Sequence, residues 1–485
     1  MKRFSLNDIP LGVYLVATAV IALVTAGVLL LMQNISERQR EGQQDAFRVV
    51  PLSEDVTDPK QWGLNYPMQY DAYLRTVDIE RTRYGGSEAV QKLDKDDRWK
   101  TIWAGMPFSV DFREDRGHAY MLIDQRETER VKQFKQPGAC LHCHSSVLPA
   151  YYQKGVEAGV PPENREAAIY RGFEIINPMP YAEATQLVEH PITCNDCHTP
   201  ENMAIRVTRP AFVDGIRVLA RSDYPVPHLP SIERWRAGDR QVEYDPNTMA
   251  SRQEMRSLVC AQCHVEYYFA GQEKKVTYPW HNGLTIEAIY DYYQAAGFKD
   301  WKHKLTETPA LKAQHPEFEM WSQGVHAANG VACADCHMPY QRVGAVKISD
   351  HHVRSPMLNI NNACQTCHNQ SEADILARVN LIQDRTFAQM DRATGALVAL
   401  INDIQAAKAN GAPEDRIAQA QEFQRKASFW VDYVNAENSM GFHAPQEAMR
   451  ILGEAIDYAR QGQLAIAPWA TPKPQANTAC GVKVC

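Results

Sequence analysis

The sequence predicts a mainly α-helical protein with little sheet and with long helices near its C-terminal end. Between residues 61 and 370, short helical pieces alternate with turns rich in proline and glycine, and extended regular sheet is hard to find. From 371 to 465, apolar residues recur mostly at spacings of three and four, the period of amphipathic helices. The 485 residues, 45% of them hydrophobic, are enough to bury a large core.

The N-terminal segment is long and apolar enough to span a membrane. Residues 11–32 contain no charged residue, and at about 1.5 Å per residue they cross a hydrocarbon core of about 30 Å. No clear cleavage site follows, so residues 1–35 are interpreted as a membrane anchor, with a cleaved signal as the alternative. Residues 36–60 are expected to form a linker. In either case the bulk of the chain is expected outside the cytoplasm.

Ten of the twelve cysteines lie in five copies of the motif C-x-x-C-H. This motif is the signature of covalent c-type haem attachment. Zinc binding by the C-x-x-C pairs is disfavoured, because a histidine follows every pair, the intervals are uneven and the motifs lie behind an export segment. We expect five haems to form much of the core of the region 61–370. The motifs are Cys140-Cys143-His144, Cys194-Cys197-His198, Cys260-Cys263-His264, Cys333-Cys336-His337 and Cys364-Cys367-His368.

The two remaining cysteines, Cys480 and Cys485, lie in a proline-rich tail over residues 466–485. A disulfide between them is expected in an oxidising compartment, and a thiol contact with another chain is the alternative. The net charge of the chain is −7 and it has no basic run. Nucleic acid is therefore not expected as a partner.

An electron carrier and an enzyme differ in whether every haem iron has a second axial ligand from the protein. The motifs use five of the sixteen histidines as proximal ligands. An electron-transfer haem needs a second axial ligand, commonly histidine, whereas a haem that binds substrate keeps one face open. The remaining histidines exceed any need, so counting alone leaves both classes open.

Five stretches of the chain resemble the pentahaem cytochrome c nitrite reductases, which form ammonia. The similarity runs from about residue 60 to 465, and the order of all five haem motifs agrees. It implies a multihaem cytochrome c fold with five covalently bound haem c groups and a six-electron reduction of nitrite to ammonium. The stretches are "GHAYMLIDQRETERV" at 117–131, "CAQCHVEYYF" at 260–269, "LKAQHPEFEMWSQGVHAANGVACADCHMP" at 311–339, "SDHHVRSP" at 349–356 and "GFHAPQEAMRIL" at 441–452.

The resemblance also implies a distal histidine for four of the five haems. The second haem would receive His351, the third His118, the fourth His443 and the fifth His326. His351 is preferred over its neighbour His352 because it follows an aspartate as in the family motif. No distal histidine is implied for the first haem, which would therefore be the open one.

The first motif departs from the common family pattern. Most members have lysine as the proximal ligand of the catalytic iron, and here His144 stands at that place. Histidine is a well-attested haem ligand, so the departure concerns the electronic tuning of that iron and not its attachment. His142, inside the same motif, is interpreted as a spacer residue.

Three side chains are implied on the open side of the first haem: Arg130, Tyr267 and His315. Arg130 supplies a positive charge for an anionic substrate, and His315 can hydrogen-bond an oxygen and deliver a proton. Tyr267 can donate a hydrogen bond or gate a radical intermediate.

A calcium ion is the second implied cofactor. Its ligands would be side-chain oxygens of Glu266 and Gln314 and the backbone carbonyls of Tyr267 and Lys312. Hard oxygen ligands of this kind suit Ca²⁺, and the ion would hold the neighbouring catalytic residues in place.

Two other functions stay open at this point. A pure electron carrier would need a distal ligand for the first haem, and a related reductase would act mainly on hydroxylamine or sulfite. The expected partners of the leading function are nitrite, a membrane quinol-oxidising multihaem cytochrome or similar donor, and a second copy of the chain. The expected location is the periplasmic face of the cytoplasmic membrane, or the periplasm after cleavage. The carrier's candidate ligands are His190, His228, His281 and His303.

Overall fold

The computed structural model describes residues 10–41, 48–88, 90–113, 116–344 and 346–470. Cys480 and Cys485 lie outside the described residues. The chain divides into two compact units, Met1–Pro51 and Leu52–Cys485.

The first unit contains one long helix, α1 (Leu11–Glu41), which continues past residue 35, where the linker was expected to begin. Its stretch Leu11–Ser36 has a mean hydropathy of 2.6, and none of it is buried. By length and composition this helix can cross a membrane, and a signal sequence passes the same test.

The second unit begins with short helices. Several of them start with proline at the first helical position, where a missing N–H costs nothing and the fixed φ suits the helix. Part of the expected linker is bound to this body, since Glu54 accepts two hydrogen bonds from Arg206 at 2.6 and 2.9 Å. The helices up to residue 258 are α2 (Pro59–Asn65), α3 (Pro67–Leu74), α4 (Lys92–Lys95), α5 (Arg98–Ile102), α6 (Met121–Glu127), α7 (Glu129–Gln133), α8 (Leu141–His144), α9 (Leu148–Glu157), α10 (Arg165–Ile176), α11 (Tyr181–Ala184), α12 (Cys194–Cys197), α13 (Pro210–Arg221), α14 (Pro230–Ala237), α15 (Pro246–Met249) and α16 (Arg252–Leu258).

Sheet is limited to three antiparallel two-stranded pairs in the described residues. They are β1 (Tyr268–Ala270) with β2 (Lys275–Thr277), β3 (Trp301–Lys302) with β4 (Pro309–Ala310), and β5 (Tyr340–Val343) with β6 (Val346–Ser349). Between and after them lie α17 (Ile286–Ala295), α18 (Glu317–Ser322), α19 (Val325–Ala328), α20 (Cys333–His337) and α21 (Ile360–Ala363).

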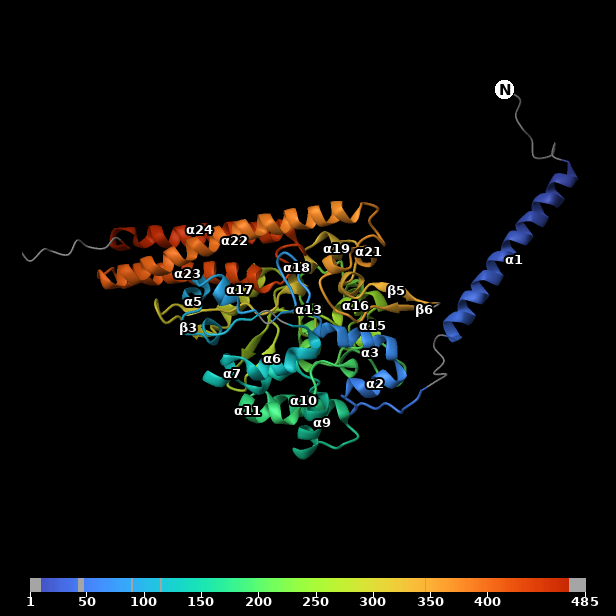
Figure 1. The fold of residues 1–485 in the computed structure, drawn as a ribbon, viewed down its shortest axis with the longest axis horizontal. Coiled ribbons are helices and arrows are strands. Elements are labelled where there is room, and N and C mark those ends of the chain that lie inside the picture. Colours follow the sequence, from blue (N-terminus) through green and yellow to red (C-terminus); the bar gives the residue numbers. More distant parts are fainter. Residues whose placement is uncertain (1–9, 42–47, 89, 114–115, 345, 471–485) are drawn as a thin grey trace, which may run out of the picture. The chain divides into compact units, whose positions relative to one another are not determined.

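Three long helices close the second unit: α22 (Glu372–Ala409), α23 (Glu414–Ala436) and α24 (Pro445–Ala470). They lie side by side along one side of the body, in orange and red (Figure 1). Ser371 caps the start of α22, and Gly411, with φ of +78°, follows its end. The mainly helical fold with long C-terminal helices is confirmed.

The buried residues form two hydrophobic clusters. One joins the long helices to α5 and α17, with Leu397, Leu400 and Trp430 among its members. The other surrounds the first three haem motifs and includes Leu141 and Ala261, which lie inside motifs. The first three motifs are therefore built into the interior of the second unit, whereas Cys367 and His368 of the fifth motif are exposed.

Candidate functional site

The five motifs lie on or next to short helices. The first motif occupies the turn Gly138–Cys140 and α8, the second α12 and the fourth α20, while the third follows α16 and the fifth follows α21. None of the ten motif cysteines forms a disulfide in the described structure. Their thiols are therefore available for thioether bonds to haem.

Four of the motif histidines each face a second histidine ring, and the distance between ring centroids is nearly the same in all four pairs. The ring centroids are 6.2 Å apart for His198 and His351 and 6.5 Å apart for His264 and His118. They are 6.3 Å apart for His337 and His443 and 6.4 Å apart for His368 and His326. The structure thus brings together all four histidine pairs expected from the sequence.

This centroid separation equals the distance expected when two imidazoles bind the same metal ion from opposite sides. A histidine nitrogen binds a transition metal at about 2.0 Å, and the ring centre lies ~1.1 Å further away. Two imidazoles on opposite sides of one iron therefore have ring centres about 6.2 Å apart. The four histidine pairs fit this geometry.

The Nδ1 atoms of several of these rings are held by other groups of the protein. His198 Nδ1 lies 2.9 Å from the carbonyl oxygen of Met203, and His351 Nδ1 lies 2.8 Å from that of Ser349. His337 Nδ1 lies 3.1 Å from the carbonyl oxygen of Arg354. Such bonds fix the tautomer and leave Nε2 as the ligand atom, as in other metal-binding histidines.

His443 differs from these three rings, because its Nδ1 is bound by the carboxylate of Glu437. Sequence reasoning missed Glu437, since no local motif marks a carboxylate six residues before a histidine as its partner.

His315 also approaches His264, with ring centroids 6.4 Å apart. The two rings share one carboxylate: Glu317 Oε1 lies 3.7 Å from His264 Nδ1 and 4.0 Å from His315 Nδ1. His315 is therefore near the Nδ1 side of His264, whereas an iron ligand would face Nε2. This geometry favours His118 as the partner of His264.

His352 is engaged elsewhere, with Nε2 3.4 Å from a carboxylate oxygen of Glu80. His142 is fully buried, and its Nδ1 lies 3.3 Å from the hydroxyl of Tyr151, as suits a spacer residue in the core. Burial lowers the pKa of His142 well below its usual value, which keeps the ring neutral.

Three of the four histidines considered for a pure carrier, His303, His281 and His228, have other side-chain contacts. Both ring nitrogens of His303 are close to protein oxygens, the Thr101 carbonyl at 2.9 Å and the Thr306 hydroxyl at 3.0 Å. His281 stacks on Tyr292 with ring centroids 4.4 Å apart. His228 packs against Trp321 on α18, and burial lowers its pKa to about 4.

Thiols of different motifs adjoin one another. The Cys263 thiol of the third motif lies close enough to Cys143 of the first to raise the pKa of Cys143, together with burial. The Cys333 thiol of the fourth motif acts in the same way on Cys260 of the third. Electrostatic contacts also join the second motif to the third, through Cys197 and Cys263, and the fourth to the fifth, through Cys336 and Cys364. The third motif is therefore the centre of the array.

Arg130 and Tyr267 lie close to the first motif. The charge of Arg130 acts on the Cys140 thiol, whose pKa burial raises to about 11. Tyr267 is close to Cys143, Cys140 and Arg130, and burial raises the pKa of its phenol well above the usual value. The phenol is therefore a protonated hydrogen-bond donor at neutral pH.

Arg130 is held on one side by an aromatic ring and on the other by a helix cap. Its guanidinium carbon lies 4.3 Å from the ring centroid of Phe108. Its Nε donates to the hydroxyl of Thr128, the N-cap of α7, at 3.3 Å.

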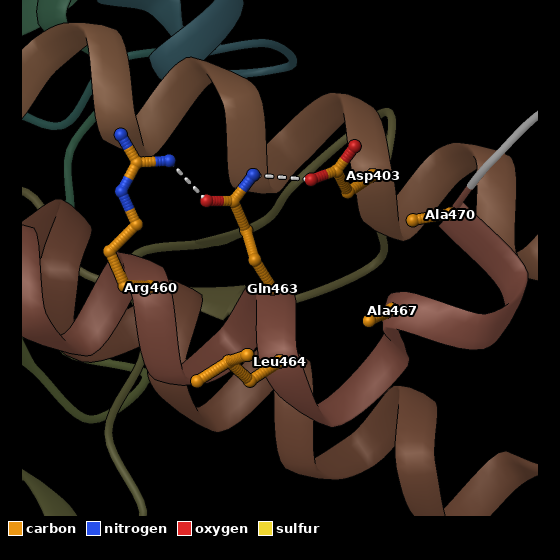
Figure 2. Close-up of a pocket in the computed structure, with 6 residues that line it drawn as sticks. All are labelled: Asp403, Arg460, Gln463, Leu464, Ala467 and Ala470. Carbon is orange, nitrogen blue, oxygen red and sulfur yellow. Dashed lines mark hydrogen bonds between the residues drawn. The ribbon is translucent and has the colours of Figure 1, made fainter.

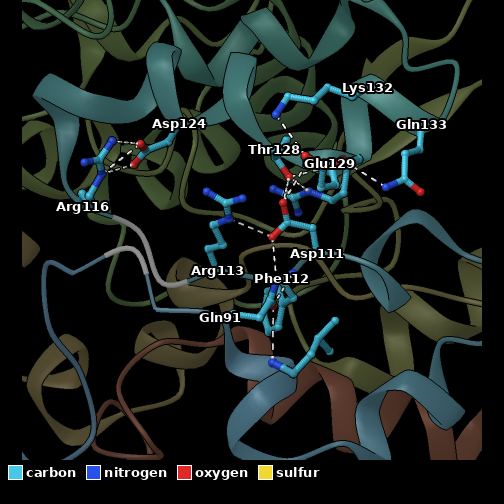
Figure 3. Close-up of polar contacts among 12 residues, drawn as sticks. Gln91, Asp111, Phe112, Arg113, Arg116, Asp124, Thr128, Glu129, Lys132 and Gln133 are labelled. Atoms are coloured by element: carbon cyan, nitrogen blue, oxygen red, sulfur yellow. Dashed lines mark hydrogen bonds and ion pairs between the residues drawn. The ribbon is translucent and has the colours of Figure 1, made fainter.

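Asp111, only 1% exposed, anchors that cap. Its Oδ2 accepts from the Thr128 hydroxyl at 2.8 Å and from the Glu129 amide at 2.7 Å, while Oδ1 accepts from Gln91 at 2.8 Å (Figure 3). Sequence reasoning missed Asp111 because, apart from its close neighbour Arg113, its partners are 17 to 20 residues away in the chain.

The expected calcium ligands converge around a fully buried carboxylate, Glu266. One Glu266 oxygen accepts from the Gln314 amide N–H at 2.7 Å, and the side-chain amide of Gln314 lies 3.3 Å from the carbonyl oxygen of Lys312. Burial raises the pKa of Glu266 well above its usual value, and Glu319 and Asp300 nearby add to the effect. A cation among these oxygens would offset the clustered negative charge, so the residues fit Ca²⁺.

No group of three or more histidine, cysteine, aspartate or glutamate side chains able to hold a metal by itself is found among the described residues. The calcium ligand set contains a single carboxylate and relies on carbonyl oxygens, so it is not a group of that kind.

A separate pocket of about 470 Å³ lies between α22 and α24 (Figure 2). It is lined by Asp403, Arg460, Gln463, Leu464, Ala467 and Ala470. It includes no residue of the haem motifs or of the group around Arg130, and it is not a candidate active site.

Comparison with known proteins finds one family model and relatives that share its name. The cytochrome c552 family model matches residues 58–480. The cytochrome c-552 of Parabacteroides distasonis is 37% identical over 411 residues, covering 83% of this chain and 75% of that protein. That of Porphyromonas gingivalis is 34% identical over 452 residues, covering 90% of this chain and 82% of that protein.

A solved structure is also similar to this chain, the cytochrome c nitrite reductase from Desulfovibrio desulfuricans. It has a TM-score of 0.73 and 28% sequence identity, covering 87% of this chain and 88% of that one. That protein is described as a catalytic subunit with two calcium sites.

A helical body that carries repeated C-x-x-C-H motifs and facing histidine rings defines a multihaem c-type cytochrome. The chain belongs to the cytochrome c552 family and is an oxidoreductase of the cytochrome c nitrite reductase class. The family resemblance read from the sequence is confirmed.

Proposed function

We propose that this protein reduces nitrite to ammonium with six electrons at its first haem, fed by four haems that each have two histidine ligands. The observation that carries the proposal is the set of four histidine pairs. Each pair has the centroid separation that suits an iron between two rings, and each joins a motif histidine to its expected distal partner. These pairs account for the second to fifth motifs.

The first haem is proposed as the open one because two of the three expected catalytic side chains, Arg130 and Tyr267, lie near its motif. Arg130 and Tyr267 act electrostatically on the Cys140 and Cys143 region. A permanent cation and a protonated phenol are suited to an anionic substrate whose oxygens are removed as water. When bound there, the haem supplies an iron that accepts the substrate nitrogen and passes electrons to it.

Arg130, His315 and Tyr267 would supply charge and protons to the substrate at the first haem. Arg130 would bind the nitrite oxygens, because a unit charge pair near 4 Å contributes about 4 kcal/mol at an effective dielectric of 20. Stacking on Phe108 and the hydrogen bond to Thr128 orient the guanidinium before substrate arrives. His315 would hydrogen-bond an oxygen and transfer a proton to it. Tyr267 would donate a further hydrogen bond.

A calcium ion at Glu266, Gln314 and the carbonyls of Tyr267 and Lys312 is proposed as a structural partner of the site. Tyr267 adjoins Glu266, and His315 adjoins Gln314, so the ion would hold both catalytic residues in place. The buried negative charge around Glu266 supports this assignment.

The thiol contacts support a path for electrons. The third motif adjoins the first, second and fourth, and the fourth adjoins the fifth. Electrons that enter at the fifth or the second haem would therefore reach the first haem through the third.

The proposed setting is the periplasmic face of the cytoplasmic membrane, with α1 as anchor, or the periplasm if α1 is a cleaved signal. The apolar stretch Leu11–Ser36 supports a membrane role for this helix. A membrane quinol-oxidising multihaem cytochrome or similar donor would supply electrons. A homodimer through the long C-terminal helices is proposed on the grounds of their length and apolar stripe.

The direct test is ammonium formation from nitrite by the purified holoprotein with a reduced viologen dye as donor. The expected result is one ammonium for each nitrite consumed, with six electrons taken from the dye. Hydroxylamine and sulfite are assayed in parallel. Turnover of either of these with none of nitrite would replace the proposed substrate, and no turnover of any of the three would favour an electron carrier.

A further inference from the structure

The histidine rings assigned as axial ligands differ in what holds their Nδ1 atoms. Around the second haem, the Nδ1 atoms of His198 and His351 both lie against neutral backbone carbonyls. Around the fourth haem, His337 also faces a backbone carbonyl, that of Arg354. His443, whose ring centroid lies 6.3 Å from that of His337, instead faces the carboxylate of Glu437.

The carboxylate of Glu437 is well placed to act as a fixed charge. Glu437 is 1% exposed. Its Oε2 accepts from the Ser439 hydroxyl at 2.8 Å, and the Ser439 oxygen accepts from the His443 amide at 3.0 Å. This closed turn holds the carboxylate and the ring together. Because the group is shielded from water, its charge acts on the ring with less screening than a surface charge would have.

A carboxylate hydrogen-bonded to Nδ1 increases the donor strength of the histidine as an iron ligand. It draws the Nδ1 proton toward itself, so that more electron density resides on Nε2 and the ring becomes a stronger donor. A stronger donor and a nearby negative charge both favour ferric over ferrous iron. Both effects lower the reduction potential of the haem.

We propose that Glu437 is a tuning residue that lowers the reduction potential of the fourth haem below the value that two carbonyl-bound histidines would give. The second haem, with carbonyl partners on both rings, is the internal reference. The third haem is not used as a reference, because the carboxylate of Glu317 lies 3.7 Å from Nδ1 of its own histidine, His264. This proposal rests on the role of His443 as an axial ligand in the proposed function.

The test is a spectroscopic redox titration of the holoprotein and of Glu437→Gln. Glutamine can still accept the Nδ1 proton in a hydrogen bond but carries no charge. The low-spin signal of the fourth haem is identified as the one altered in His443→Ala. We expect the midpoint potential of that haem to rise in Glu437→Gln while the signal keeps its low-spin form. The midpoint of the second haem should stay unchanged.

The control is Glu454→Gln, which removes one negative charge from α24, where Glu454 accepts from Trp430 at 2.9 Å and is paired with Arg450 at 2.7 Å. This variant should shift no haem potential. If Glu437→Gln leaves every midpoint unchanged, or shifts the fourth haem no more than Glu454→Gln does, the tuning role is overturned and the ligand assignment stands. If His443→Ala alters no low-spin signal, the ligand assignment itself fails.

Discussion

Arg130 illustrates how a single side chain is prepared for its role. Its position depends on Phe108, which stacks under the guanidinium, and on Thr128, which accepts from Nε. Thr128 is in turn held by the buried carboxylate of Asp111. The charge is thus oriented by residues from two separate segments before any ligand binds.

Replacing Arg130 by alanine should leave all haems attached but reduce nitrite turnover by about 10²–10³-fold, the usual effect of losing one preorganised electrostatic donor. The assay is steady-state nitrite consumption normalised to haem content. Arg116→Ala is the matched control, because that guanidinium is bound to Asp124 and stacks on Tyr120. If the Arg130 variant retains the activity of the control, Arg130 is not in the substrate site.

His315→Asn tests the proton donor. Asparagine keeps a hydrogen-bonding group of similar reach but cannot cycle a proton, so turnover should fall by about 10²–10⁴-fold. The electron paramagnetic resonance spectrum should retain its low-spin signals. If one of them becomes high-spin, then His315, whose ring lies 6.4 Å from that of His264, is the distal ligand in place of His118.

For single residues, the sequence predicts those that belong to motifs and misses those that hold the motif or site residues in place through hydrogen bonds. Each C-x-x-C-H marks its own haem, and the resemblance supplied partners that the structure brings to 6.2–6.5 Å. Asp111 and Glu437 carry no such mark. Their importance comes from tertiary contacts with Thr128 and His443, and a lone acidic residue in a sequence is most often a surface charge.

Among the elements, α9 and α10 cross so closely that only glycine fits at the contact. A Cβ at Gly172 would overlap the carbonyl oxygen of Tyr151, and one at Gly155 would overlap that of Ala168. Tyr151 also contacts His142 inside the first motif. The crossing therefore adjoins the first motif through Tyr151 and His142.

Gly172→Ala should lower the free energy of unfolding by about 1–3 kcal/mol or more, because the two helices must separate. Gly453→Ala on α24 is the control, since an added Cβ there meets nothing within 4 Å. That variant should raise stability by up to about 1 kcal/mol through helix propensity. Thermal unfolding of both holoproteins checks this, and equal melting temperatures would mean that the crossing is not tight.

We expect calcium to be required for the ordered positions of two segments, the loop before α18 and the segment that follows the third motif. Treatment with a calcium chelator should lower nitrite turnover while the low-spin haem spectrum remains, because Tyr267 and His315 lose their support. Added Ca²⁺ should restore turnover, and Mg²⁺, which demands stricter octahedral geometry, should not. Full activity in protein shown by elemental analysis to lack calcium would contradict this role.

The elements differ in how well the sequence predicts them. The long helices α22, α23 and α24 follow from an apolar period, capping residues and breakers such as Gly411, but α24 runs to Ala470, five residues past the expected end of the helical region at 465. The short helices could be expected only as a class. Helices of four to seven residues have little intrinsic stability, so their ends are set by tertiary packing and by the motifs they carry.

At the scale of the whole molecule, the motifs form one connected array. The thiols of the third motif act electrostatically on those of the first, second and fourth motifs, and the thiols of the fifth motif act on those of the fourth. Uneven spacing along the sequence gives no indication of this order, because it arises from how distant segments pack. Four closed haems beside one open haem would let the protein hold several electrons close to a substrate that needs six.

The central claim is that the first haem alone is open, and one combined measurement tests it. Electron paramagnetic resonance of the oxidised holoprotein should show four low-spin haems and one high-spin haem. Titration of the reduced holoprotein with carbon monoxide should end at one molecule bound per chain. Five low-spin haems without carbon monoxide uptake would contradict the account and indicate an electron carrier.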